Sequence, residues 1–116
     1  MTTEVQQDLF SVPHNVSLDH CAAQDLEMTK GISSVFYKKF GRLDELTNQQ
    51  HKVKRVLRLE DGFRSLLYMV TRKSYIDRAS YEDIWRGLTN LKKVVCNYDI
   101  KNLALPKIGH ALVNLD

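Results

Sequence analysis

One short segment restricts the fold of this chain more than any other: residues 66–71, Leu-Leu-Tyr-Met-Val-Thr, are apolar almost throughout. A strand without a polar face is typical of a sheet covered on both sides, as in layered α/β proteins. The segment follows Asp61-Gly62, a strong turn signal, and before that turn Val53–Leu59 alternates without a clean apolar face. The sequence therefore predicts a β-hairpin within a layered α/β domain.

The patterns before the hairpin predict two strands and two helices. Val5–Phe10 suits a weak first strand, and Val16–Ala23 suits a second. From Ile32 the apolar residues fall on one helical face as far as Gly41, a residue type that commonly follows a helix. A short helix is expected over Leu43–Gln50.

A long helix is expected after Ser80, because serine suits the N-cap position and Asp83 stands three residues later. Apolar residues at helical spacing predict its buried face: Ile84, Trp85, Leu88, Leu91, Val94 and Val95. Leu103–Pro106 predicts a short last strand. Since no repeat or linker divides the sequence, residues 1–116 are expected to form a single domain.

Composition limits the classes of function. The chain has 116 residues, of which 43% are hydrophobic and 27% charged, the make-up of an ordinary globular domain. No apolar run approaches the ~20 residues of a membrane span, and the polar start Met1–Glu4 does not suit a signal peptide. We therefore expect a cytoplasmic or nuclear protein with no membrane partner. The net charge of +3 is too mild to favour nucleic acid, and a small anionic ligand suits it as well.

Few side chains indicate metal or redox chemistry. Cys21 and Cys96 lie far apart in sequence and are expected to be free, buried thiols. His20, His51 and His110 share no ligand spacing, so no metal site is predicted. The densest basic stretch, residues 51–55, fits either contacts with phosphates or a solvated strand face.

Two glycine-containing loops suit phosphate binding. Met28–Ile32 leads directly into a predicted helix, and Lys107–Ala111 follows the last predicted strand. Unpaired N–H groups at a helix start attract anions, and glycine lets the main chain approach a diphosphate closely. An ordinary turn gives the same pattern, so spacing alone leaves both interpretations open.

A series of short segments resembles the macro domain (macrodomain) family. In chain order they are Asp8–Phe10, Ser17–Cys21, Met28–Ile32, Phe36–Gly41, Leu46–Gln50, Tyr68–Lys73, Ser80–Glu82 and Leu105–Gly109. Within the family they are most similar to single-domain glycohydrolases that remove terminal ADP-ribose from proteins. The resemblance implies a three-layer α/β/α sandwich with a mixed central sheet and an ADP-ribose crevice at the strand ends. Because the sequence stops at Asp116, we expect it to lack the family's C-terminal helix and strand.

The resemblance also implies which residues bind the ligand. Asp8 would accept the adenine amino group, and the backbone of Leu9 would help to hold the base. Two phosphate loops would follow, the first formed by Met28, Thr29, Lys30, Gly31 and Ile32 and the second by Gly109, His110, Ala111 and Leu112. Thr29, Lys30 and Ala111 replace smaller residues of the family, so a looser fit is expected, which the positive charge of Lys30 would partly offset.

The positions implied in catalysis depart from the family. In the resembled glycohydrolases a lysine attacks the anomeric carbon of the ribose and an aspartate assists, where this chain has Arg72 and Val113. Arginine stays protonated and is no amine nucleophile, and valine cannot accept a proton. Lys73 could substitute for the lysine only at a local irregularity, because in a regular strand it points to the opposite face.

We therefore expect a reader or pseudoenzyme that binds ADP-ribose or a mono-ADP-ribosylated protein, needs no cofactor and has little or no hydrolase activity. One alternative is an active hydrolase that removes mono-ADP-ribose from Glu or Asp side chains. Another is a protein-interaction domain that no longer binds nucleotide. The short C-terminus further predicts a homo-oligomer or a partner chain that covers the exposed face of the sheet.

Overall fold

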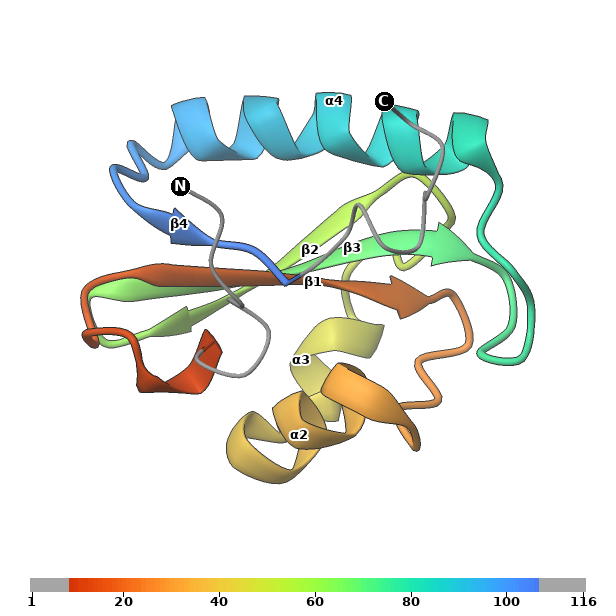
Figure 1. Cartoon of the computed structure of the whole chain (residues 1–116), viewed down its shortest axis with the longest axis horizontal. Coiled ribbons are helices and arrows are strands. Elements are labelled where there is room, and N and C mark those ends of the chain that lie inside the picture. Colours follow the sequence, from red (N-terminus) through yellow and green to blue (C-terminus); the bar gives the residue numbers. More distant parts are fainter. Residues whose placement is uncertain (1–8, 107–116) are drawn as a thin grey trace.

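The structure is a computed structural model that describes residues 9–106, and its centre is a four-stranded mixed sheet between helices (Figure 1). The elements are the 3-10 turn η1 (Leu9–Ser11), strands β1 (Ser17–Ala23), β2 (Val56–Asp61), β3 (Arg64–Arg72) and β4 (Leu103–Ala104), and helices α2 (Gly31–Phe40), α3 (Leu43–Thr47) and α4 (Tyr81–Asn97). The strand order is β2-β3-β1-β4, with β1 parallel to β3 and β4, and β2 antiparallel to β3. Helix α4 covers one face, and α2 and α3 lie against the other. The predicted α/β/α arrangement with a mixed sheet is confirmed.

The predicted hairpin is present, and its second strand is buried on both sides. In β3, Leu66, Tyr68 and Val70 join the cluster beneath α2 and α3, whereas Leu67 and Met69 join the cluster beneath α4. All five are 0% exposed. Burying each such side chain stabilises the fold by about 1.5–3 kcal/mol, which explains why a strand at this position cannot carry a polar face.

Helix α4 begins as the sequence predicts, because the Ser80 Oγ accepts a hydrogen bond from the Asp83 N–H at 3.0 Å. Gly87 lies against β3, where an added Cβ would come within 2.8 Å of the Met69 side chain. The expected burial of Trp85 is wrong: it is 47% exposed and packs on Tyr81, with ring centroids 6.1 Å apart. Trp85 adjoins Ile84 in sequence, and a helix turns by about 100° per residue, so only one of the two can face the sheet.

Helix α2 ends at Phe40, and Gly41 follows as its C-cap, as predicted, with φ at +57° and its N–H bonded to the Tyr37 carbonyl at 2.9 Å. Helix α3 is shorter than expected and ends at Thr47. Beyond it, the Gln49 side chain donates to the Arg58 carbonyl at 2.8 Å and accepts from the Arg58 N–H at 2.9 Å. The side-chain amide thereby pairs with strand β2 in place of a further helical turn.

Three other expectations need correction or cannot be assessed. The described end of the first predicted strand, Leu9 and Phe10, belongs to η1, where the Phe10 ring packs edge-on against Phe36 with centroids 5.1 Å apart. Of the two cysteines, Cys21 is partly buried but Cys96 is exposed, because it lies on the outer side of α4. Burial raises the pKa of the Cys21 thiol to about 12. Residues 107–111, the second predicted phosphate loop, lie outside the described part of the chain.

The first hairpin strand begins later than expected, at Val56 rather than Val53. Lys54 has φ at +83°, and its N–H bonds to the Val70 carbonyl at 2.8 Å, while the Val70 N–H bonds to the Arg55 carbonyl at 2.8 Å. The chain therefore approaches β3 through an irregular turn before regular pairing starts.

Across residues 9–106, no helix combines the length and apolar character needed to cross a membrane.

Strand β1 carries two fully buried ionisable groups, Asp19 and His20, whose side chains alternate between the two faces of the sheet. Burial raises the pKa of Asp19 well above 3.8, and the nearby backbone N–H of His20 offsets this only in part. That N–H is not positioned for a full hydrogen bond, so neither carboxyl oxygen has a hydrogen-bond partner among the described residues. The His20 ring stacks on Phe36 at 3.8 Å, and burial lowers its pKa from 6.5 to about 3. The fold therefore favours the neutral form of both side chains.

These two groups give opposite dependences of stability on pH. The raised pKa of Asp19 means that the free energy of unfolding falls as pH rises above about 3.8. The depressed pKa of His20 contributes stability that is present above 6.5 and is lost as pH falls towards about 3. Urea unfolding should be measured at pH 4, 5.5 and 7. As pH rises, the free energy of unfolding of Asp19→Asn should increase relative to that of the wild type by up to about 1.4 kcal/mol per pH unit. A difference between the two proteins that does not change with pH would contradict this prediction.

Candidate functional site

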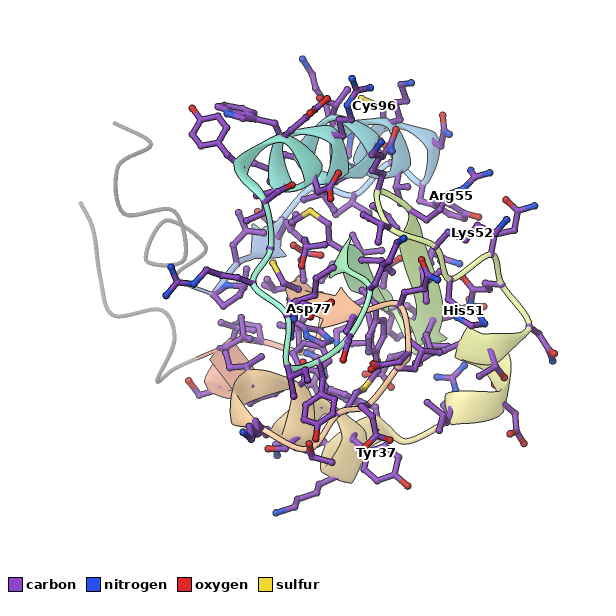
Figure 2. All side chains as sticks on the ribbon, turned by 90° about the vertical axis from the view of Figure 1, so that its right-hand side faces the viewer. Tyr37, His51, Lys52, Arg55, Asp77 and Cys96 are labelled. Carbon is purple, nitrogen blue, oxygen red and sulfur yellow. The ribbon has the colours of Figure 1, made fainter. Side chains whose placement is uncertain are left out.

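The carboxyl ends of β1 and β3 lie side by side and form the edge on which the sequence predicts the ligand crevice. Figure 2 looks onto this end of the molecule, with Asp77 near the middle and His51, Lys52 and Arg55 to one side. Pairing continues past both strands, since the Gln24 N–H bonds to the Arg72 carbonyl at 2.7 Å and the Asp25 N–H to the Lys73 carbonyl at 3.1 Å. The two segments that leave the sheet here therefore run together.

The pairing contains an irregularity at this edge. Ala22 is opposite Val70, but Ala23 is opposite Arg72, so Thr71 is one extra residue in β3. Its hydroxyl turns back to the Ala22 carbonyl at 3.5 Å. Such an inserted residue bends a strand and redirects the side chains beyond it.

Asp25 joins the two segments with its carboxylate. One oxygen accepts from the Glu27 N–H at 2.9 Å, and the other accepts from the Tyr75 N–H at 3.0 Å. Slight burial acts to raise the pKa of Asp25, but these N–H groups, the Ser74 hydroxyl and the positive charge of Arg72 together hold it below its usual value. The sequence analysis missed this residue, although an aspartate two positions before the N–H it binds is a recognisable local turn signal.

The first predicted phosphate loop is at this edge, between β1 and α2. Met28 is buried and anchors the loop, Ile32 is partly buried, and Thr29, Lys30 and Gly31 are exposed. Gly31 has φ at +60°, and Lys30 is the N-cap of α2 without a side-chain hydrogen bond to the helix. The first turn of α2 therefore presents uncapped N–H groups together with a flexible cation, as anion binding requires.

Helix α2 is fixed to the end of β1 by Ser33. Its hydroxyl donates to the Cys21 carbonyl at 3.2 Å and lies 3.3 Å from the Nδ1 of His20. The Nδ1 of His20 is also 3.0 Å from the Cys21 carbonyl. The neutral His20 ring thus helps to position the start of the helix that follows the predicted phosphate loop.

Arg72 and Lys73 line the same cavity, of about 470 Å³, between the end of β3, residues 53–54 and the start of α4. Arg72 is partly buried and donates from Nη1 to the Thr71 Oγ1 at 3.3 Å, whereas Lys73 is exposed. A regular strand would send these neighbours to opposite faces, but β3 has its extra residue at Thr71 and ends at Arg72. The local irregularity that a role for Lys73 would require is therefore present.

The remaining predicted site residues are only partly described. Leu9 is fully buried in η1, whereas Asp8, Gly109, His110, Ala111, Leu112 and Val113 lie outside the described residues. Within residues 9–106, no three His, Cys, Asp or Glu side chains come together as metal ligands would. The structure thus brings the first phosphate loop, Arg72 and Lys73 to one edge of the sheet.

A mixed sheet between helical layers, with a helix-initiating loop at its carboxyl edge, is the architecture of a macrodomain. Solved structures agree: the macrodomain of Thermus aquaticus DarG superposes with a TM-score of 0.76 at 18% identity, covering 93% of this chain and 87% of that chain. The macrodomain of Mycobacterium tuberculosis DarG gives a TM-score of 0.73 at 18% identity, covering 86% of this chain and 72% of that chain.

Sequence comparison identifies the family. The chain is 36% identical to the ADP-ribose glycohydrolase OARD1 of Homo sapiens over 113 residues, which are 97% of this chain and 74% of that protein. The Bos taurus OARD1 gives the same identity and coverage. No protein-family model matches the chain. The chain belongs to the macrodomain family, and its curated relatives there are ADP-ribose glycohydrolases.

The carboxylate of Asp25 should control the order of this edge. In Asp25→Ala the N–H groups of Glu27 and Tyr75 lose their acceptor, so their amide hydrogen exchange should accelerate by about tenfold, with a cost of about 1 kcal/mol in unfolding free energy. Asp77→Ala is the control, because Asp77 accepts from the nearby Ser74 N–H and removing it leaves the link to β1 intact. Equal exchange at Tyr75 in both variants would contradict the role of Asp25.

Proposed function

We propose that this macrodomain binds ADP-ribose or mono-ADP-ribosylated proteins as a reader, with little or no glycohydrolase activity. Its relationship to ADP-ribose glycohydrolases supports ADP-ribose as the ligand. The exposed loop Thr29–Gly31, at the uncapped start of α2, supports contacts with the diphosphate. The observation that carries the proposal is Arg72, which is at the end of β3 where the family resemblance implies a nucleophilic lysine.

Arg72 suits binding better than catalysis. A guanidinium stays protonated at any physiological pH, so it offers no lone pair for attack on the anomeric carbon of the ribose. Its permanent charge and its donor to Thr71 suit instead a fixed cation beside an anionic ligand. Val113, at the position implied for the assisting aspartate, has no group that could orient water or accept a proton.

An active hydrolase is the second candidate, and one observation favours it. Lys73 lines the same cavity as Arg72 and carries an amine that could act as a nucleophile after losing its proton. Its exposure to solvent argues against this role, because an exposed lysine side chain is flexible and strongly hydrated, whereas attack on the ribose needs a positioned amine.

ADP-ribose should bind one to one in calorimetric titration. Lys30→Ala should weaken binding by about three- to tenfold, because it removes a cation next to the uncapped N–H groups of α2. Lys38→Ala, in the last turn of the same helix, is the matched control and should leave affinity unchanged. If millimolar ADP-ribose produces neither heat nor a thermal shift, the chain is instead a protein-interaction domain without nucleotide binding.

Single-turnover assays on a mono-ADP-ribosylated protein separate the reader from the hydrolase. The wild type should release no ADP-ribose above background, and Arg72→Lys or Val113→Asp alone should recover little. The double variant should exceed the product of the single gains, because an amine nucleophile and its acid–base partner act as a unit. Wild-type turnover that Lys73→Ala abolishes would overturn the reader proposal and establish the hydrolase.

A further inference from the structure

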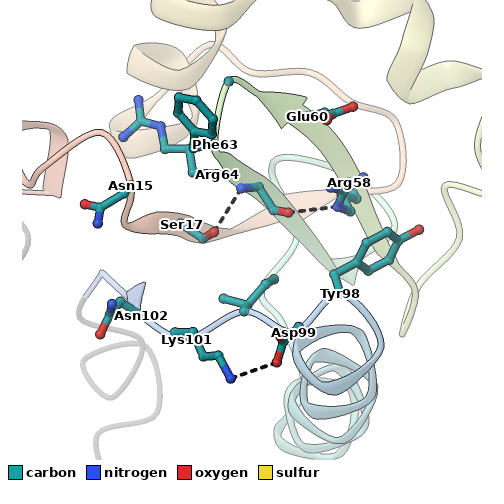
Figure 3. A pocket seen from close by; sticks show the side chains of 13 residues that line it. Asn15, Ser17, Arg58, Glu60, Phe63, Arg64, Tyr98, Asp99, Lys101 and Asn102 are labelled. Atoms are coloured by element: carbon teal, nitrogen blue, oxygen red, sulfur yellow. Dashed lines mark hydrogen bonds and ion pairs between the residues drawn. The ribbon is translucent and has the colours of Figure 1, made fainter.

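A second hollow lies at the opposite end of the sheet from Arg72. It has a volume of about 320 Å³ and lies between the β2–β3 turn, the start of β1 and the segment that follows α4 (Figure 3). The sequence analysis assigned no role to its residues. Because it is at the amino end of β1, it is separate from the carboxyl edge that carries the proposed ADP-ribose site.

Arg58 forms one wall of the hollow, and its guanidinium is held in a fixed position. The Cζ lies 3.9 Å from the centroid of the Tyr98 ring, and Nε donates to the Ser65 Oγ at 2.8 Å. Ser65 is itself fixed, since its N–H donates to the Ser17 Oγ at 2.9 Å. The Gln49 amide clamps the Arg58 backbone from the other side. A long side chain fixed in this way loses little further freedom when it binds a ligand.

Two donor groups of Arg58 are not used within the described part of the chain. Nε is bonded to Ser65, but neither Nη group makes a hydrogen bond or an ion pair with any residue in the range 9–106. The carboxylate of Asp99, which also lines the hollow, pairs with Lys101 at 3.0 Å instead. A partly buried guanidinium therefore lines the hollow while both Nη groups lack partners among the described residues, and such a planar pair of donors matches a carboxylate or a phosphate.

The other side chains suit an apolar body attached to such an anion. Phe63, at the hairpin turn, is 98% exposed, and Tyr98 is 54% exposed with one face on Arg58. They stand on two sides of the hollow, and the amides of Asn15 and Asn102 lie along its third side (Figure 3). Tyrosine and arginine are among the residue types that dominate binding energy at interfaces.

We propose that this hollow is a second binding site, which takes an oxyanion carried on an apolar body. Arg58 holds the carboxylate or phosphate oxygens with its Nη donors, and the rings of Phe63 and Tyr98 contact the apolar part. The site does not depend on ADP-ribose binding, and it allows the domain to hold a second partner group while the carboxyl edge is occupied.

The test is an NMR titration of the ¹⁵N-labelled full chain with three probes: 3-phenylpropionate, phenyl phosphate and the neutral 3-phenylpropionamide. The reporters are the Arg58 Nε–H and the backbone N–H groups of Ser65 and Tyr98. At least one anion should give saturable shifts at these groups with a Kd in the millimolar range and should bind about tenfold more tightly than the amide. The anion that binds more tightly identifies the oxyanion as a carboxylate or a phosphate.

Variants assign the effect to the fixed guanidinium. Arg58→Gln should weaken anion binding by about tenfold or more, and Arg58→Lys should recover only part of it, because a lysine keeps the charge without the planar donor pair. Lys92→Gln, on the exposed side of α4, is the charge-matched control and should bind as the wild type does. Should Arg58→Gln not fold, Tyr98→Leu removes the ring under the guanidinium and should likewise weaken binding.

The proposal is overturned if neither anion gives a saturable shift at millimolar concentrations, if the amide binds as tightly as the anions, or if a folded Arg58 or Tyr98 variant keeps its affinity. Shifts confined to residues 28–32 and Arg72 would also overturn it, because they would place the anion at the carboxyl edge. Titration with ADP-ribose in the same samples tests the proposed function separately, through shifts at residues 28–32.

Discussion

The structure depends on the burial of β3 on both of its faces. Because Leu66, Tyr68 and Val70 face one helical layer while Leu67 and Met69 face the other, the strand is stable only between two layers. Its two edges are also used, by β2 on one side and by β1 on the other. The strand can therefore carry functional side chains only where it leaves the sheet, and Arg72 is at that point.

Features governed by local rules could be predicted from the sequence. Three such features are confirmed: the hairpin turn at Asp61-Gly62, the N-cap at Ser80 and the helix end at Gly41. Each depends only on residues that are close together in sequence. The family resemblance added the layer order and the mixed sheet. Trp85 was misassigned because helical spacing alone does not define the width of the buried stripe.

The finer features of the candidate site depend on contacts between distant segments and could not be predicted. The extra residue at Thr71 is visible only when β3 is aligned with β1, and β3 ends directly after it, where Arg72 and Lys73 line one cavity. The contact from Asp25 to Tyr75 joins residues 50 positions apart. These contacts fix the two segments that leave the sheet at this edge, one of which leads to the predicted phosphate loop and the other of which carries Arg72.

The outer edge of β2 shows how this sheet ends. Gln49 occupies both backbone hydrogen-bonding groups of Arg58, and the Arg42 guanidinium donates to the Glu60 carbonyl at 2.7 Å while pairing with Glu45. Side chains from the α3 region thereby stand where the backbone of a fifth strand would lie. An unpaired strand edge is a template for another molecule, so this arrangement disfavours edge-to-edge aggregation and strand exchange along β2.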